Sequence, residues 1–197
     1  MPRSARQKAQ TRERILAAAG RRFRARGLAG AGVIEIMAAA GLTHGGFYAH
    51  FANKAELAGA ALETALAEAR ASWLDGLAAL PPADAYRQLI GRYLSRAHRD
   101  ERVAGCPMAA LASELAREDE STRAAFERGF SATIAALEQV MPAADHAAPR
   151  ERALATMALV LGGLLLSRMV AQPSLSDETL LASRRAALKP LAAASGS

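Results

Sequence analysis

The chain has 197 residues, which suits one large domain or a small domain joined to a medium one, and its single cysteine excludes an internal disulfide and a cysteine-rich zinc site. The helix formers Ala, Leu, Arg and Glu are abundant and aromatic residues make up only 5%, so we expect an all-α fold and exclude architectures built on strands. The formal net charge of +6 and a pI of about 10.2 make nucleic acid a candidate partner.

The first part of the chain is predicted to form a small domain of three helices over residues 1–53. Residues 1–10 are polar and basic, and we expect them to be a flexible arm. The first helix carries an apolar stripe at helical spacing, formed by Ile15, Ala19 and Phe23. The three predicted helices span residues 11–26, 33–40 and 43–51, with Gly27 and Gly41 ending the first two.

Positive charge is concentrated in the first 54 residues. They hold ten Lys and Arg against Glu13 and Glu35, a net charge of +8, whereas the remainder holds 15 against 17, a net charge of −2. This asymmetry predicts that one end of the protein meets an anion such as DNA phosphate. A solubilising tail is the alternative, but a tail would not carry periodic apolar residues. The ten cations are Arg3, Arg6, Lys8, Arg12, Arg14, Arg21, Arg22, Arg24, Arg26 and Lys54.

Residues 54–197 are predicted to form a second domain of six helices. Asn53 and Glu56 have the spacing of a capping box, so a long helix begins here and extends to about Leu80. Pro81 and Pro82 then break the chain. The other five helices are predicted over residues 83–99, 107–117, 120–141, 150–171 and 176–191.

The longest apolar run extends from Ala153 to Leu166 and lies between Arg152 and Arg168. Its 14 residues are fewer than the roughly 20 that span a bilayer, so we interpret the run as a buried helix. The basic N-terminus lacks the apolar segment of a signal peptide. We therefore expect a cytoplasmic protein with no membrane partner.

The stretch between Val33 and Phe51 has the pattern of a helix-turn-helix, a motif that presents its second helix to the DNA major groove. Gly41 can adopt the positive φ that the tight turn requires. Four apolar side chains can anchor the two helices on the first helix: Ile36, Leu42, Phe47 and Phe51. Five residues are left towards solvent or the groove: Thr43, His44, Gly46, Tyr48 and His50.

The segment from Gly41 to Leu57, GLTHGGFYAHFANKAEL, closely resembles the recognition region of the TetR family of transcriptional regulators. The usual form in that family is Gly-Val-Ser, a basic residue, Gly, a small residue, Phe-Tyr, two variable or His positions, Phe, two residues, Lys, two residues and Leu. The helix before it and the Val33–Ile36 segment also fit the family pattern. The resemblance covers residues 11–57 and implies a dimeric, ligand-sensing repressor that binds a palindromic operator.

The resemblance also implies roles for single residues. Thr43 would cap the recognition helix and touch phosphate, Tyr48 would contact the DNA backbone or a base edge, and Lys54 would neutralise a phosphate. Packing remains the alternative for Tyr48, and a solvent-facing position without a role remains the alternative for His50. The residues expected to contact DNA are Arg12, Thr43, His44, Gly45, Gly46, Tyr48, His50 and Lys54.

Four positions depart from the family pattern. Gly32 replaces the usual Thr and so removes a hydroxyl that would contact phosphate, and Met37 replaces a small Ala. His44 stands where Lys or Arg is common, so this contact would depend on pH. Gly46 costs the helix up to about 1 kcal/mol of propensity, but it can let the backbone approach DNA closely.

The apolar run near the C-terminus is expected to form the dimer interface. A helix that is apolar nearly all round must be covered on both sides, and one chain has only the last helix left to cover it. This arrangement resembles the four-helix bundle formed by the last two helices of each TetR-family subunit, with Gly162 and Gly163 allowing close approach. The central helix of a monomeric core is the alternative. The expected interface residues are Leu154, Leu161, Gly162, Leu165 and Leu188.

The middle helices are expected to enclose a pocket for a small-molecule effector. Because buried charges are not clustered there, an apolar or uncharged molecule would fit best. Each candidate residue can also be plain core. The candidates are Trp73, Tyr93, Cys106, Met108, Leu111, Phe126, Phe130 and Met157.

The segment Gly105-Cys106-Pro107-Met108 looks like the Gly-Cys segment that opens the sixth helix in a branch of the TetR family. Some repressors of that branch sense electrophiles or oxidants through this cysteine. A thiolate at a helix N-terminus is stabilised, so the chemistry is reasonable. An inert buried thiol is the alternative.

Other classes of function find less support. The four histidines show no metal spacing, no Glu-x-x-His occurs, and neither a Gly-rich phosphate loop nor a nucleophile elbow is present, so we expect neither an enzyme nor a cofactor or metal. A sequence-independent architectural DNA protein would not need the large apolar body. An activator on the same fold remains an alternative to a repressor.

Overall fold

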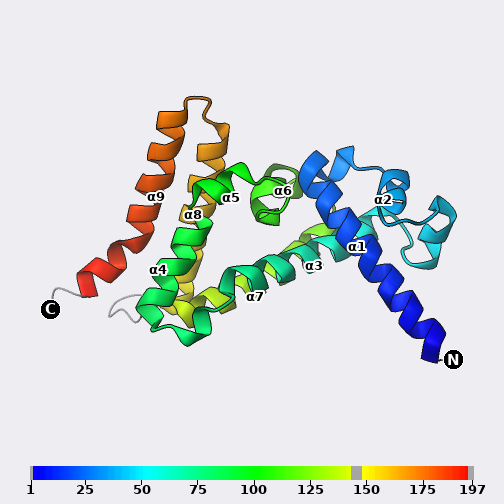
Figure 1. The fold of residues 1–197 in the computed structure, drawn as a ribbon, viewed down its shortest axis with the longest axis horizontal. Coiled ribbons are helices and arrows are strands. Elements are labelled where there is room, and N and C mark those ends of the chain that lie inside the picture. The colour runs from blue at the N-terminus through cyan, green and yellow to red at the C-terminus, as the bar shows by residue number, and fades with distance from the viewer. Residues whose placement is uncertain (1, 143–147, 195–197) are drawn as a thin grey trace. The chain divides into compact units, whose positions relative to one another are not determined.

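A computed structural model describes residues 2–142 and 148–194, and these residues form helices without a strand (Figure 1), which confirms the all-α prediction. Glycines and prolines lie at several of the helix boundaries, as their backbone preferences require. The elements are α1 (Pro2–Gly30), α2 (Val33–Ala39), the 3₁₀ helix η1 (His44–Ala49), α3 (Lys54–Leu74), the 3₁₀ helix η2 (Leu77–Ala79), α4 (Pro82–Tyr93), α5 (Arg96–Asp100), α6 (Pro107–Leu115), α7 (Glu120–Val140), α8 (Pro149–Met169) and α9 (Pro173–Ala194).

The chain divides into two compact units. The first contains residues 1–68 and 106–130, and the second contains residues 69–105 and 131–197. Helix α6 and the first half of α7 therefore pack with the N-terminal helices. The boundary at residue 53 that we expect between a DNA-binding domain and an effector-binding domain remains a prediction.

The first unit is organised around α1. Its inward face supplies Ile15 and Phe23; α2 adds Ile36, η1 adds Phe47, and Phe51 follows η1, and all five side chains are buried. The burial confirms the last three side chains as anchors, while Leu42 is only half-buried. Gly27 interrupts α1 with φ 78° and ψ 168°, so the regular helix stops there as predicted and a last turn follows to Gly30.

Three elements differ from the sequence-based expectation. Residues 2–10, expected as a flexible arm, continue α1, because this segment is rich in Ala, Arg, Lys and Gln and contains no glycine. The recognition segment is a 3₁₀ helix rather than an α-helix, and Gly45 and Gly46 supply little helix propensity. The helix predicted over residues 83–99 is two helices, α4 and α5, joined through Leu94 and Ser95.

The second unit is held together by α4, α8 and α9 (Figure 1). Tyr86 of α4 is fully buried; its hydroxyl donates to the Ala187 carbonyl of α9 at 2.9 Å and lies 3.3 Å from the Thr156 hydroxyl of α8. Burial raises the pKa of Tyr86. One side chain thus ties the three helices together through satisfied polar contacts.

Helix α5 is fastened to the N-terminal part of α9. Arg99 donates to the Ser176 hydroxyl at 2.9 Å and to the Asp177 carboxylate at 2.7 Å, and Arg96 pairs with the same carboxylate. These two guanidinium groups lower the pKa of Asp177. Arg168 of α8 donates to the carbonyl oxygens of His98, Arg99 and Glu101, so it caps the C-terminal end of α5.

Helix α8 contains the apolar run, extends beyond it at both ends and lies close to the predicted range of residues 150–171. Its 21 residues contain an 18-residue window that is apolar enough to cross a membrane, and 39% of that window is buried inside the structure. The core helix of a soluble protein passes the same test of length and composition, so this window does not contradict the interpretation of the run as a buried helix. Large apolar side chains on α8 remain exposed, including Leu154, Leu159, Leu166 and Met169.

Candidate nucleic-acid interface

The turn between α2 and η1 is fixed by Gly41 and Arg14. Gly41 has φ 69°, which confirms the predicted positive φ. Arg14 donates to the Ala40 carbonyl at 2.6 Å, and a Cβ at Gly41 would lie 2.9 Å from that guanidinium. A side chain at position 41 would therefore disturb both the turn and the cation that caps α2.

Aromatic rings anchor η1 within the first unit. Phe47 and Phe51 stack with their centroids 5.9 Å apart, and the guanidinium of Arg12 lies over the Phe51 ring at 4.8 Å. Arg12, expected to contact DNA, is half-buried and engaged with this ring. The two phenylalanines face inward; between them Tyr48 and Ala49 are exposed and His50 is half-buried.

The outward face of η1 carries Thr43, His44 and Tyr48, and all three are exposed. Tyr48 is 68% exposed, which argues against the alternative that this ring is buried packing. Its ring meets Phe47 and His44 edge-on at 5.2 and 6.1 Å. Thr43 occupies the N-cap position, but its side chain makes no capping hydrogen bond.

The predicted capping box at the start of α3 is present, except that Glu56 accepts from the amide of Ala52 and not from that of Asn53. The Glu56 amide donates to Asn53 Oδ1 at 2.8 Å, and the Glu56 carboxylate accepts from the Ala52 amide at 2.7 Å. Lys54 is thereby held at the first position of α3, where its ammonium group donates to the Ala29 carbonyl at 3.3 Å. Gly45 is exposed, and Gly46 and His50 are half-buried.

The residues expected to line an effector pocket fall into both units. In the second unit, Trp73 and Tyr93 lie 5.3 Å apart, and both rings pack against the buried His98. Burial lowers the pKa of His98 to about 4. In the first unit Phe126 and Phe130 stack at 5.6 Å, and Cys106, Met108 and Leu111 are buried.

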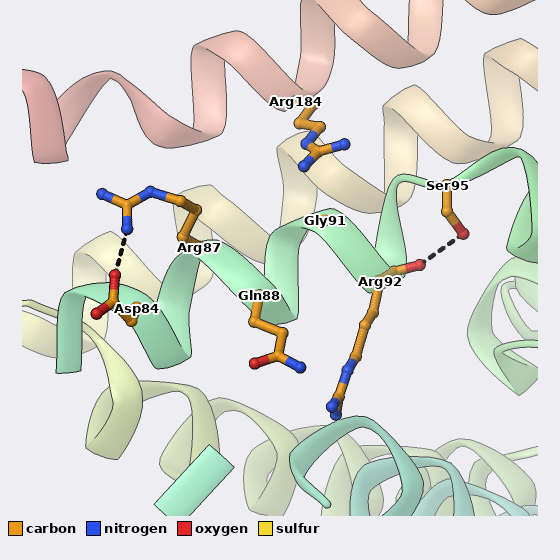
Figure 2. Close-up of a pocket in the computed structure, with 7 residues that line it drawn as sticks. All are labelled: Asp84, Arg87, Gln88, Gly91, Arg92, Ser95 and Arg184. Atoms are coloured by element: carbon orange, nitrogen blue, oxygen red, sulfur yellow. Dashed lines mark hydrogen bonds and ion pairs between the residues drawn. The ribbon is translucent and has the colours of Figure 1, made fainter. Parts of the chain in front are cut away.

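An open groove of about 520 Å³ lies between α4 and α9 (Figure 2). Arg184 of α9 lies against Gly91, whereas Arg92 turns away to donate to the carbonyl oxygens of Trp73 and Asp75. The groove is lined by Asp84, Arg87, Gln88, Gly91, Arg92, Ser95 and Arg184. None of these residues was expected in the effector pocket.

Cys106 occupies the N-cap position of α6, directly before Pro107, as the sequence indicates. Its side chain is 2% exposed. Arg24 of α1 lies within electrostatic reach: burial lowers the pKa of this arginine, and the charges of Glu68 and Cys106 raise it. Among the described residues no group of three His, Cys, Asp or Glu side chains could hold a metal ion.

The residues expected at a dimer interface lie on α8 and α9. Leu154 is exposed, and Leu161, Gly162, Leu165 and Leu188 are half-buried. Gly163 behaves differently from its neighbour, because a Cβ there would lie 2.5 Å from the Ser183 Cβ of α9. Gly163 therefore serves packing within one chain, and the expectation that both glycines face a partner was wrong for Gly163.

Two structural contacts of the N-terminal helices escaped the sequence analysis. Arg14 was noted only for its charge, yet it closes the α2 turn. Glu114 of α6 accepts hydrogen bonds from the amides of Leu28 and Ala29. Because 26 and about 86 residues separate these partners, local sequence patterns carry no signal for either contact.

An exposed recognition segment, a turn fixed by glycine and a concentration of positive charge in the same helices define a helix-turn-helix DNA-binding regulator. The family described as "Bacterial regulatory proteins, tetR family" matches residues 15–61, and "Transcriptional regulator LmrA/YxaF-like, C-terminal domain" matches residues 82–174. The chain belongs to the TetR family of transcriptional regulators, which are DNA-binding proteins and not enzymes.

Known proteins of the same kind align over most of the chain. The HTH-type transcriptional regulator LmrA of Bacillus subtilis (strain 168) is 27% identical over 161 residues, 80% of this chain and 86% of LmrA. The structure of a TetR transcriptional regulator from Chloroflexus aurantiacus J-10-fl is 26% identical, with a TM-score of 0.70 over 91% of this chain and 95% of that one. The reduced form of NemR from E. coli has the same fold, at 24% identity and a TM-score of 0.73 over 90% and 95% of the two chains.

Proposed function

We propose that this protein is a cytoplasmic repressor that binds a palindromic operator as a dimer and is released by a small apolar or electrophilic effector. The observation that carries the proposal is the exposed face of η1 beside a strongly cationic N-terminal segment. In this proposal residues 1–53 bind DNA and residues 54–197 bind the effector and the second subunit.

The DNA contact is assigned to the outward residues of η1 and to the start of α3. Tyr48 and His44 offer polar groups to a groove, and Thr43 and the exposed Gly45 offer a hydroxyl and backbone amides to phosphate. Lys54 has three donors, so it can keep the Ala29 carbonyl and still reach a phosphate oxygen. Arg12, Gly46 and His50 complete the proposed contact surface.

The second subunit is proposed to cover the exposed apolar residues of α8 and α9. Leu166, Met169 and Leu181 are each more than half exposed in the single chain, and a patch of this kind marks an interaction surface. A partner chain explains the apolar surface without a membrane, and α8 also keeps Thr156 and Ser167 buried and hydrogen-bonded within the chain. Leu154, Leu161, Gly162, Leu165 and Leu188 are the proposed interface residues.

The effector is proposed to act on the helical body, either in an apolar pocket or at Cys106. The pocket candidates remain Trp73, Tyr93, Cys106, Met108, Leu111, Phe126, Phe130 and Met157. Reaction at Cys106 would require exposure of a buried thiol, and an adduct there would displace the start of α6. An electrophile is therefore expected to react more slowly than with an exposed cysteine.

The proposal is tested by electrophoretic mobility shift on DNA fragments selected from the genome with the wild-type protein. Tyr48→Ala and Lys54→Ala should each weaken binding by about 1–3 kcal/mol, because each removes a groove or charge-assisted contact. Tyr48→Phe separates the hydroxyl from the ring, and Arg123→Ala removes an exposed cation from α7 as a control. Unchanged binding by both Ala variants would exclude this surface as the DNA contact.

A further inference from the structure

The break in α1 at Gly27 leaves two backbone amides without a regular helical arrangement. Gly27 has φ 78° and ψ 168°, so the amides of the next two residues no longer continue the helix of residues 2–26. The carboxylate of Glu114 in α6 accepts both: Leu28 donates at 2.7 Å and Ala29 at 3.2 Å. A single side chain from α6 therefore accepts hydrogen bonds from both amides of the turn that follows Gly27.

The position of this carboxylate depends on the absence of a side chain at residue 27. A Cβ there would lie 2.7 Å from Glu114 Oε2 and closer still to Oε1. Glycine is thus needed both for the positive φ and for the space that the carboxylate occupies. Glu114 also stands next to the last residue of α6, where a negative charge is unfavourable for the helix dipole. The carboxylate does not stabilise α6 itself. Its stabilising partners are the amides of Leu28 and Ala29.

The same turn also holds a residue of the proposed DNA contact. The carbonyl of Ala29 accepts from Lys54 Nζ at 3.3 Å. The Ala29 amide thus donates to Glu114, and the Ala29 carbonyl accepts from Lys54. Displacement of Glu114 would free the turn that orients the Lys54 ammonium group.

Helix α6 is in a position to hold the turn firmly. The space left between α6, α1 and α3 is a cavity of about 10 Å³, too small for more than one water molecule. Its walls include Phe23 of α1, Leu62 of α3, and Pro107 and Leu111 of α6. All of these residues, Glu114 and Lys54 belong to the first compact unit. A shift of α6 would therefore change the position of Glu114 relative to the Leu28 and Ala29 amides.

We propose that Glu114 is a positioning residue: its carboxylate fixes the turn at residues 27–29 in the conformation in which Lys54 can engage DNA, and α6 controls DNA affinity through this contact. The inference rests on the proposed operator binding. The proposed role of Glu114 predicts the opposite of what net charge alone would predict for DNA affinity. Removal of a negative charge from a DNA-binding protein should tighten binding, whereas loss of the Glu114 carboxylate is expected to weaken it.

The test compares Glu114→Ala, Glu114→Gln and Glu127→Ala on the shortest duplex recovered by selection with the wild-type protein. Glu114→Ala should bind about tenfold more weakly, because two hydrogen bonds to a charged group are lost. Glu114→Gln keeps an acceptor oxygen and should remain within about threefold of wild type. Glu127→Ala removes an exposed carboxylate from α7 of the same unit and should bind as well as wild type or more tightly.

Two further readouts separate positioning from general loss of structure. In a double-mutant cycle, Lys54→Ala should cost less affinity in the Glu114→Ala background than in the wild type, because both residues act on one turn. The amide of Leu28 should exchange its hydrogen about tenfold faster in Glu114→Ala, with or without DNA. Exchange elsewhere in α1 that stays unchanged shows that the unit remains folded.

The outcomes decide between the two proposals. A wild-type protein that selects no specific duplex overturns the proposed function and this inference with it. Wild-type binding that Glu114→Ala leaves unchanged or tightens overturns the inference alone. Additive effects of the Glu114 and Lys54 substitutions, or unchanged exchange at Leu28, also overturn it.

Discussion

Gly162 and Gly163 are neighbours in α8, and the structure predicts opposite consequences for the same substitution at the two positions. A methyl group at residue 163 would lie 2.5 Å from the Ser183 Cβ, whereas at residue 162 nothing lies within 4 Å. The first glycine faces away from its own chain and the second packs against α9. Ala at 163 therefore tests the fold, and a large residue at 162 tests the dimer.

The packing cost follows from comparing the two alanine variants. Both replace a helical glycine with Ala and gain up to about 1 kcal/mol of helix propensity. Only Gly163→Ala forces α8 and α9 apart, and overpacking of this kind costs about 1–3 kcal/mol. The difference in the free energy of unfolding between the two variants should therefore be about 1–3 kcal/mol, with Gly162→Ala the more stable.

Urea unfolding at one fixed protein concentration measures this difference, since dimer stability depends on concentration. Light scattering of Gly162→Leu then tests the interface, and this variant should be a folded monomer at concentrations where the wild type is a dimer. A double replacement at both positions would not separate the two effects, because the change at residue 163 damages the single chain. Equal stability of the two Ala variants would refute the α8–α9 packing, and a dimeric Gly162→Leu would refute the proposed interface.

Three other predictions follow from single sites. Gly27→Ala should destabilise the protein by at least about 1 kcal/mol in urea unfolding, because an L-residue is strained at positive φ, while Gly30→Ala, which meets only ordinary contacts, should not. Because the pKa of His98 is about 4 when folded and near 6.5 when unfolded, the unfolded state binds more protons between these values; stability should fall by up to about 3 kcal/mol as pH falls from 6.5 to 4, and the pH dependence should flatten in His98→Phe. If Cys106 is a sensor, Cys106→Ser should keep DNA binding but no longer release DNA on electrophile treatment; release that persists in this variant, or alkylation that follows an ordinary thiol pKa of about 8.5, would leave Cys106 as packing.

Local sequence patterns predicted most of the helices because glycine and proline mark their ends. Gly27 and Gly41 have the positive φ values that stop α1 and turn the chain after α2. The same patterns missed the division between α4 and α5, since residues 94 and 95 contain neither glycine nor proline. Ser95 caps α5 by accepting from the His98 amide, a local signal that could have identified the break.

The candidate site could be predicted only in part. Apolar spacing identified Phe47 and Phe51 as buried and left Tyr48 exposed, because residues four apart lie on the same face of a helix. The 3₁₀ form of η1 was not predicted, although Gly45 and Gly46, which supply little helix propensity, were a local signal for a departure from the α-helix. The Glu114 contact with Leu28 is a tertiary interaction between segments that are far apart in the sequence. The residues around Glu114 therefore do not indicate which amide its carboxylate will bind.

Operator selection tests the central claim most directly. Purified wild-type protein is mixed with fragmented genomic DNA, the bound fragments are sequenced, and the affinity for the recovered site is compared with that for a scrambled duplex at the same salt concentration. A specific regulator is expected to recover a palindromic site and to bind it at least about 10³-fold more tightly than the scrambled duplex, with affinity falling steeply as salt rises. Equal affinity for the two duplexes, or recovered fragments with no shared sequence, would contradict the assignment of this protein as an operator-binding repressor.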